Sequence, residues 1–147
     1  MRPFSIPAGL LLLLSCASDK PPTRPVIFPD LGERAQLLPP GGRSDRPVVT
    51  EELYRGLSQN SSLVRVERPI PLHVHQHSEE SVYILQGSGI LHLVDEEELP
   101  VSAGDLVIVP RGVAHGYTPD DGEASLVLSI FSPPLRDDDR QRVDERD

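Results

Sequence analysis

Cysteine, aromatic side chains and positive charge are all scarce in this sequence. One cysteine, Cys16, stands among 147 residues, so the chain cannot form a disulfide framework of its own. Tryptophan is absent and aromatic residues make up 4% of the chain, so a core has to be aliphatic. Lysine and arginine total 14 against 23 aspartates and glutamates. This acidic balance argues against nucleic acid and against a polybasic membrane patch as partners.

The first 15 residues have the composition of a secretory signal peptide. Arg2 provides a short positively charged region, and residues 6–14 form an apolar run that is too short to span a bilayer as a permanent helix. Small residues follow this run. The sequence therefore predicts that residues 1–15 are a targeting signal rather than part of the fold.

The end of this segment is more specific. The sequence LLSC at residues 13–16 resembles the lipobox of bacterial lipoproteins, in which the signal is cleaved before a cysteine that carries lipid. The resemblance implies that Cys16 is lipidated and that the protein is extracytoplasmic and anchored to the bacterial membrane. Because Ala17 rather than aspartate follows, similarity to a known sorting rule favours the outer membrane where the cell has one. The alternative is an ordinary signal peptide with an incidental cysteine.

Composition divides the remaining chain into three parts. Residues 16–47 are rich in proline, which predicts an extended tether without a helix, although the apolar groups at 26–28 and 37–38 could dock as edge strands. Residues 48–134 predict a single β-domain, since the chain is long enough for one modest domain. Residues 135–147 are almost entirely charged and predict a disordered tail.

The segment 48–134 consists of short β-prone runs separated by turn residues. This texture predicts an all-β sandwich or barrel. One short helical turn is expected at 51–57. The expected extended runs are 62–67, 73–77, 81–86, 90–94, 99–102, 106–109 and 124–131.

The stretch PLHVHQHSEESVYILQG at residues 71–87 holds three of the chain's five histidines. Side chains alternate along a strand, so His73 and His75 face the same side. His77 would join them if the strand ran on, whereas a turn at 76–78 would bring Glu80 back beside the pair. His115 follows another expected strand. Three imidazoles and one carboxylate suit a divalent transition metal with about two open positions, although strand histidines are often simply exposed.

These residues resemble the two motifs of the cupin family. The first motif has the pattern G(X)5HXH(X)3–4E(X)6G, and His73, His75, Glu80 and Gly87 match it, with Glu67 in place of its first glycine. The second has the pattern G(X)5PXG(X)2H(X)3N. Its matching residues are Gly104, Pro110, Gly112 and His115, with Pro119 in place of the final asparagine. The resemblance implies a small jelly-roll β-barrel that holds a metal through His73, His75, Glu80 and His115.

The resemblance does not assign a role to several neighbouring residues. His77 is either an exposed turn residue or a contact at the mouth of the barrel. Glu79 has the same two readings and is the substitute ligand if the turn is one residue tighter. His92 lies outside both motifs and is expected to be exposed, while Tyr83, Tyr117 and Arg111 belong either to the core or to the rim.

The resemblance also implies which functions to expect. Cupins with this ligand set include dioxygenases, isomerases, decarboxylases and oxalate-degrading enzymes that act on small molecules, and the metal is manganese, iron, zinc, nickel or copper. Glu80 is the candidate base in such an enzyme. A non-catalytic extracytoplasmic module that binds a small molecule or a metal is the alternative, and a purely structural metal is a third. Similarity to other single-domain cupins also favours a homodimer.

Overall fold

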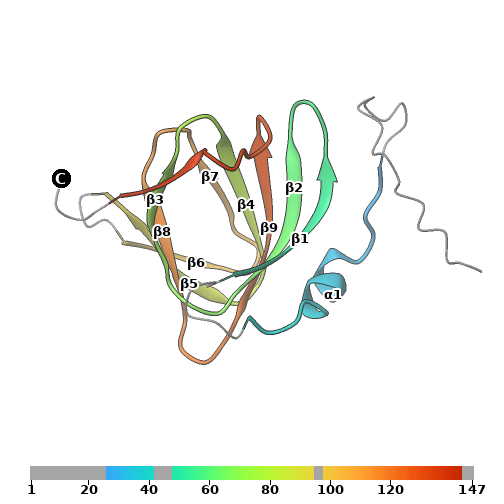
Figure 1. Ribbon diagram of the computed structural model, residues 1–147. Coiled ribbons are helices and arrows are strands. Elements are labelled where there is room, and N and C mark those ends of the chain that lie inside the picture. Colours follow the sequence, from blue (N-terminus) through green and yellow to red (C-terminus); the bar gives the residue numbers. More distant parts are fainter. Residues whose placement is uncertain (1–25, 42–47, 95–97, 144–147) are drawn as a thin grey trace, which may run out of the picture.

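The computed structural model describes residues 26–41, 48–94 and 98–143 (Figure 1). The predictions for the signal peptide and for Cys16 lie outside these ranges. One short helix and ten strands form the described part of the chain, and none of its helices has the length and apolar character needed to cross a membrane. The elements are α1 (Leu31–Gln36), β1 (Val48–Arg55), β2 (Asn60–Val66), β3 (Ile70–His75), β4 (Glu79–Gln86), β5 (Ser88–Leu93), β6 (Glu98–Ser102), β7 (Leu106–Val109), β8 (His115–Pro119), β9 (Ser125–Ser132) and β10 (Arg140–Arg142).

The strands form two antiparallel five-stranded sheets that face each other as a barrel (Figure 1). One sheet has the order β1-β2-β9-β4-β7, and the other has the order β10-β3-β8-β5-β6. The chain changes sheet at seven of the nine connections between the described strands, and only β1–β2 and β5–β6 join strands of the same sheet. This is the all-β jelly-roll barrel that the sequence predicts.

Alternation along β9 shows how the strands separate the interior from the outside. Val127, Ser129 and Phe131 line a cavity between the sheets. Leu126 and Leu128 point the other way and belong to an outer apolar cluster. Successive side chains on a strand face opposite sides, so a strand with two apolar faces can serve both layers.

The helix α1 corrects the prediction that residues 16–47 form an extended tether without a helix. Leu31, Ala35 and Leu38 follow helical spacing between two prolines, and Ala35 is 0% exposed and Leu38 7% exposed. They pack with Leu63 and Leu126 on the outside of the sheet β1-β2-β9-β4-β7. A helix this short is unstable alone, so the sheet stabilises it. The apolar groups at 26–28 and 37–38 do not form the edge strands expected of them.

Two further predictions from the sequence are wrong. The helical turn expected at 51–57 does not form, because residues 51–55 belong to β1, which pairs with β2. The tail predicted to be disordered from residue 135 contains β10, which pairs with β3 through Arg140–His75, Gln141–Val74 and Arg142–His73. Backbone hydrogen bonds to an open sheet edge need no apolar pattern, so the charged composition concealed this strand.

Candidate metal centre

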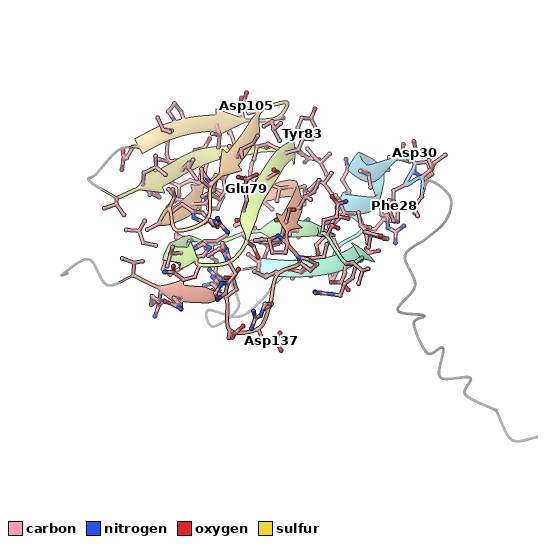
Figure 2. All side chains as sticks on the ribbon, turned by 90° about the horizontal axis from the view of Figure 1, so that it is seen from above. Phe28, Asp30, Glu79, Tyr83, Asp105 and Asp137 are labelled. Carbon is pink, nitrogen blue, oxygen red and sulfur yellow. The ribbon has the colours of Figure 1, made fainter. Side chains whose placement is uncertain are left out.

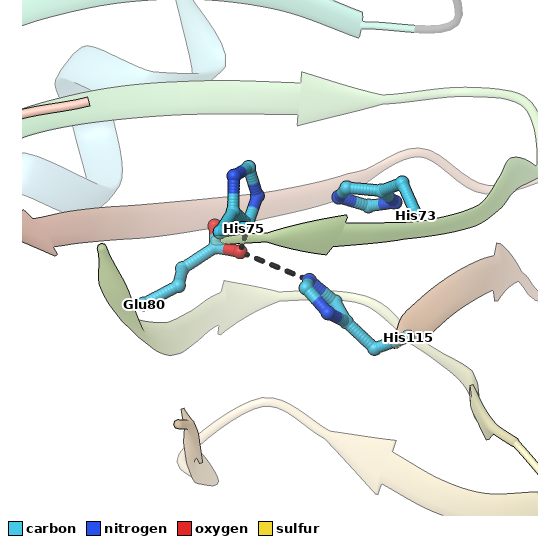
Figure 3. A group of neighbouring side chains, drawn as sticks. All are labelled: His73, His75, Glu80 and His115. Atoms are coloured by element: carbon cyan, nitrogen blue, oxygen red, sulfur yellow. Dashed lines mark hydrogen bonds and ion pairs between the residues drawn. The ribbon is translucent and has the colours of Figure 1, made fainter. Parts of the chain in front are cut away.

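Four side chains predicted as metal ligands meet inside the barrel (Figure 3). His73 and His75 project from β3, His115 begins β8, and Glu80 comes from β4 in the opposite sheet. Each offers one donor atom, and these four atoms all lie within 4.8 Å of one another. His73 is paired with His115 across the β3–β8 ladder, and their ring centroids lie 4.4 Å apart. Donors bound to one ion at about 2.0–2.2 Å lie about 3 to 4 Å apart, so the cluster has a suitable size.

Backbone carbonyls hold two of the rings in one orientation. The Nδ1 atom of His73 donates to the carbonyl of Pro71 over 2.9 Å, and Nδ1 of His115 donates to the carbonyl of Val113 over 3.1 Å. Each ring therefore carries its proton on the outer nitrogen and directs Nε2 inward. Metal-binding histidines are commonly oriented in this way.

Glu80 connects the cluster to the sheet behind it. Its Oε1 atom accepts a hydrogen bond from the Ser129 hydroxyl over 2.6 Å, and its Oε2 atom lies 3.2 Å from Nε2 of His115 and 3.7 Å from Nε2 of His75. Burial raises the pKa of Glu80, but its contacts with His115 and with the Ser129 hydroxyl outweigh this effect and hold the pKa below its usual value. The carboxylate is therefore charged and faces the histidines.

The contacts of His115 test whether a metal fits. Its Nδ1 atom faces a carbonyl and its Nε2 atom faces a carboxylate, and both of these partners only accept hydrogen bonds. A neutral imidazole has one N–H group and cannot donate to both. A bound cation between Nε2 and Glu80 would replace the missing proton. The donor set of three imidazoles and one carboxylate therefore fits a divalent transition metal.

The charge states of the other rings agree with this fit. Burial, with the nearby charges of Arg140 and His115, lowers the pKa of His73 from 6.5 to about 4. Burial also lowers the pKa of His75, although Glu80 opposes the shift. These two histidines are thus neutral near pH 7, as metal binding requires.

Asp139 lies behind His75 and was not predicted as part of the site. Its side chain is 0% exposed, and its Oδ2 atom lies 3.7 Å from Nδ1 of His75. Its Oδ1 atom accepts a 2.6 Å hydrogen bond from the backbone N–H of His77. In the DDDR sequence at 137–140, no signal separates Asp139 from its acidic neighbours, because its burial depends on the register of β10. A carboxylate here favours the proton on Nδ1 and leaves Nε2 of His75 free for a metal.

The cluster opens into a cavity of about 400 Å³ between the two sheets. The four candidate ligands lie among its walls, and most of the remaining lining is aliphatic, including Val82, Ile84 and Val107 as expected. Polar exceptions include Thr50, Asn60 and Arg140. A metal held here would face a space large enough for a small organic molecule.

The neighbouring candidates lie where the alternation of β4 and the preceding turn place them. His77 is exposed in the bend between β3 and β4, so it is separate from the four donors. Glu79 is exposed on the face of β4 opposite to Glu80, and Figure 2 shows it and Tyr83 on this strand. Glu80 faces the interior and Glu79 faces outward, so Glu80 is the glutamate that joins the histidines.

The remaining candidates divide between rim and core. His92 is half-buried rather than exposed, and its Nε2 atom lies 2.8 Å from the Thr118 hydroxyl. Tyr117 lines the cavity, and its hydroxyl lies 2.7 Å from that of Ser125. Arg111 is exposed. Tyr117 is therefore a wall of the site, whereas Arg111 is a surface residue.

Comparison with known proteins identifies the family. A family model described as a cupin domain matches residues 63–131. The uncharacterized protein MJ1618 of Methanocaldococcus jannaschii is 30% identical over 98 residues, which cover 65% of this chain and 78% of that protein. The chain belongs to the cupin superfamily.

Two further relatives are dioxygenases that match over shorter stretches. Gentisate 1,2-dioxygenase of a Ralstonia species is 34% identical over 80 residues, which are 48% of this chain and 22% of the enzyme. Acireductone dioxygenase 1 of Vitis vinifera is 31% identical over 62 residues, which are 39% of this chain and 33% of the enzyme. The chain thus spans a third or less of the length of these two enzymes.

Solved structures share the architecture. The Streptomyces protein PAC13 in complex with uridine superposes with a TM-score of 0.61 at 19% identity, over 75% of this chain and 88% of that one. A Klebsiella pneumoniae protein with a double-stranded β-helix domain superposes with a TM-score of 0.60 at 20% identity, over 75% and 91%. At these identities the similarity establishes the fold.

Proposed function

We propose that the protein is a metal-dependent enzyme of dioxygenase, isomerase or decarboxylase type that acts on a small organic molecule. The observation that carries this proposal is the opening of the four-donor cluster into the cavity of about 400 Å³. A structural metal is normally enclosed by protein ligands, whereas a catalytic one keeps a position open to a pocket. The dioxygenase relatives favour oxygen chemistry among the three reaction types, although they share less than half of this chain with it.

In this proposal His73, His75, Glu80 and His115 hold one divalent ion of manganese, iron, zinc, nickel or copper. Such an ion polarises an oxygen atom of a bound molecule. The aliphatic walls exclude water and favour a small, partly apolar substrate. Glu80 is the candidate base, because its carboxylate is charged and lines the cavity.

A non-catalytic module that binds a small molecule or a metal is the second candidate. This candidate is favoured because other polar groups in the cavity wall are already paired with protein partners. Glu52 is paired with Arg55, and the Tyr117 hydroxyl is bonded to Ser125. Within the described part of the chain, the cavity therefore offers no dedicated acid or base that is free of structural contacts, apart from the candidate ligands.

Metal analysis followed by a substrate screen separates these functions. The chain without residues 1–25 is purified and its bound metal is measured, and small oxygen-containing molecules are then tested for turnover. Glu80→Gln is compared with the parent at saturating metal, so that both proteins carry the same amount. An enzyme with Glu80 as base should lose about a hundredfold or more in rate. Equal rates would show that Glu80 is not the base, and a parent that binds no metal would refute the function itself.

We further propose that a lipid on Cys16 anchors the protein outside the cytoplasm, on the outer membrane of a cell that has one. The LLSC sequence and the proline-rich stretch after it support this location, because together they supply an attachment point and a spacer. Two or more acyl chains would hold the protein stably on the membrane.

A homodimer is also proposed. Leu106 and Ile108 of β7 are 60% and 57% exposed, and neighbouring Tyr83 of β4 is 40% exposed. They face away from the cavity at an edge of the sheet, where a second copy could cover them. Light scattering on the purified protein should give twice the monomer mass, and Ile108→Lys should shift the mass toward the monomer. A monomeric parent at micromolar concentration would contradict this proposal.

A further inference from the structure

Arg140 is placed beside the candidate metal centre by the short strand β10. Its backbone pairs directly with His75 across the β3–β10 ladder. Directly paired residues in an antiparallel ladder project to the same side and have Cα atoms about 4.5 to 5.5 Å apart. His75 points into the barrel, and Arg140 accordingly lines the same cavity as the four donors. Because the residue as a whole is exposed, its side chain lies at the mouth of this cavity.

The guanidinium of Arg140 has no carboxylate partner among the residues that the structure describes. Two other arginines of this region are paired, Arg55 with Glu52 and Arg136 with Asp138, whereas Arg142 on the same strand also has no carboxylate partner among these residues. Partial burial of the guanidinium lowers the pKa of Arg140 from its usual value. An arginine remains protonated even so, and its five N–H groups need acceptors.

The charges around the cavity favour an anion. Glu80 carries one negative charge in its wall, while Glu52 is already neutralised by Arg55. A divalent ion held by the four donors would be balanced by Glu80 and by the carboxylate of Asp139 behind His75, so Arg140 leaves one positive unit in excess. Apolar walls strengthen such an excess because they screen charge poorly. The mouth of the cavity is thus suited to a negatively charged group.

We infer that Arg140 binds the carboxylate of the substrate, and that the substrates are small, partly apolar acids with a hydroxyl or oxo oxygen next to the carboxylate. This inference rests on the proposed metal-dependent function. The guanidinium matches a carboxylate with two parallel N–H···O bonds. Because Arg140 is paired with His75, the carboxylate and the oxygen that faces the metal lie only a few bonds apart. The aliphatic walls receive the remainder of the molecule.

The test compares acids with their neutral amides. Parent protein is loaded with Co²⁺, and its metal content is measured. Calorimetry then gives the affinities for 2-hydroxybutyrate, 2-hydroxyhexanoate and mandelate and for the three corresponding amides. Arg140→Met keeps the length of the apolar stem but removes the charge. Arg140→Lys keeps the charge but removes the paired N–H groups of the guanidinium. Arg142→Met is the matched control. Arg142 is paired with His73 and lies on the same face of β10 as Arg140, but it does not line the cavity, so it controls for a nearby charge that does not reach the ligand.

The parent should bind at least one of the acids more tightly than its amide. Arg140→Met should weaken binding of that acid by about ten- to a hundredfold and change amide binding by less than about twofold. Arg140→Lys should restore part of the loss, and Arg142→Met should behave as the parent does. All variants should retain the parent's Co²⁺ content and melting temperature, because Arg140 is neither a donor nor buried in the core.

Two outcomes would overturn the inference while leaving the proposed function intact. In the first, the Co²⁺-loaded parent shows no preference for any acid over its amide. In the second, Arg140→Met retains the preference or Arg142→Met loses it equally. A parent that fails to take up one Co²⁺ per chain is a different result, since it would refute the metal-dependent function on which the inference rests.

Discussion

The carboxylate of Asp139 should control metal affinity although it is not one of the four donors. Asp139→Asn is the sharpest perturbation, because it preserves size and one acceptor oxygen while it removes the charge. In the parent, Oδ1 accepts the His77 N–H over 2.6 Å and Oδ2 lies 3.7 Å from Nδ1 of His75. The asparagine oxygen can still accept from His77, so its NH₂ group must face Nδ1. Two donors then face each other, and the tautomer with a free Nε2 on His75 loses its support.

The expected loss follows from this geometry. Removing a carboxylate behind a metal-binding histidine typically weakens metal binding about ten- to a hundredfold, which equals about 1.4 to 2.8 kcal/mol. The hydrogen bond to His77 survives in Asp139→Asn, so the stability of the metal-free protein should change less than its affinity. Asp139→Ala also leaves the buried N–H without an acceptor and should cost about 1 to 3 kcal/mol of unfolding free energy.

Competition with a chelating dye measures the affinities, and urea unfolding of the metal-free proteins measures stability. Asp138→Asn is the matched control, since its side chain is 68% exposed one residue away. It lies on the segment that leads into β10 and follows Asp137, which Figure 2 labels, in the sequence. The reasoning fails if Asp139→Asn binds metal as tightly as the parent, or if Asp138→Asn weakens binding by the same factor.

Three other predictions follow from the site and from the N-terminal segment. His75→Ala should lose most of the bound metal, as measured by mass spectrometry of the purified protein, while His77→Ala keeps it; equal losses would mean that a straight strand carries three ligands. The metal-free protein should be fully stabilised by neutral His73 above about pH 6.5, because its pKa falls to about 4 on folding and the unfolded chain binds the proton first. As pH drops from 6.5 toward 4, the free energy of unfolding should fall by as much as about 3 kcal/mol, and a flat profile from chemical unfolding would contradict this. Cys16→Ser should release the protein from the membrane fraction or leave the precursor uncleaved, whereas normal fractionation of this variant would exclude a lipid anchor.

The local pattern of the chain contains the core of the candidate metal centre. His73 and His75 stand two residues apart, and the period of a strand alone places them on one face. The turn after them is short, so Glu80 returns beside the pair, while Glu79 points outward by the same alternation. His115 is farther along the chain, and its place was predicted through the family motif rather than from its surroundings. These relations are local or belong to the family motif, and for that reason they could be read from one sequence.

Tertiary structure decided the parts whose partners lie far away in the chain. Ala35 belongs to a helix because Leu63 and Leu126 of the sheet bury its face. Asp139 and Arg140 stand in a charged run that has no apolar pattern, and pairing of β10 with β3 separates their roles. This register turns one residue toward His75 and places the next in the cavity wall. Backbone pairing to a distant strand leaves no periodic trace in side-chain polarity. The sequence, with its family motif, therefore predicted the four candidate donors, and only the folded barrel revealed the residues around them.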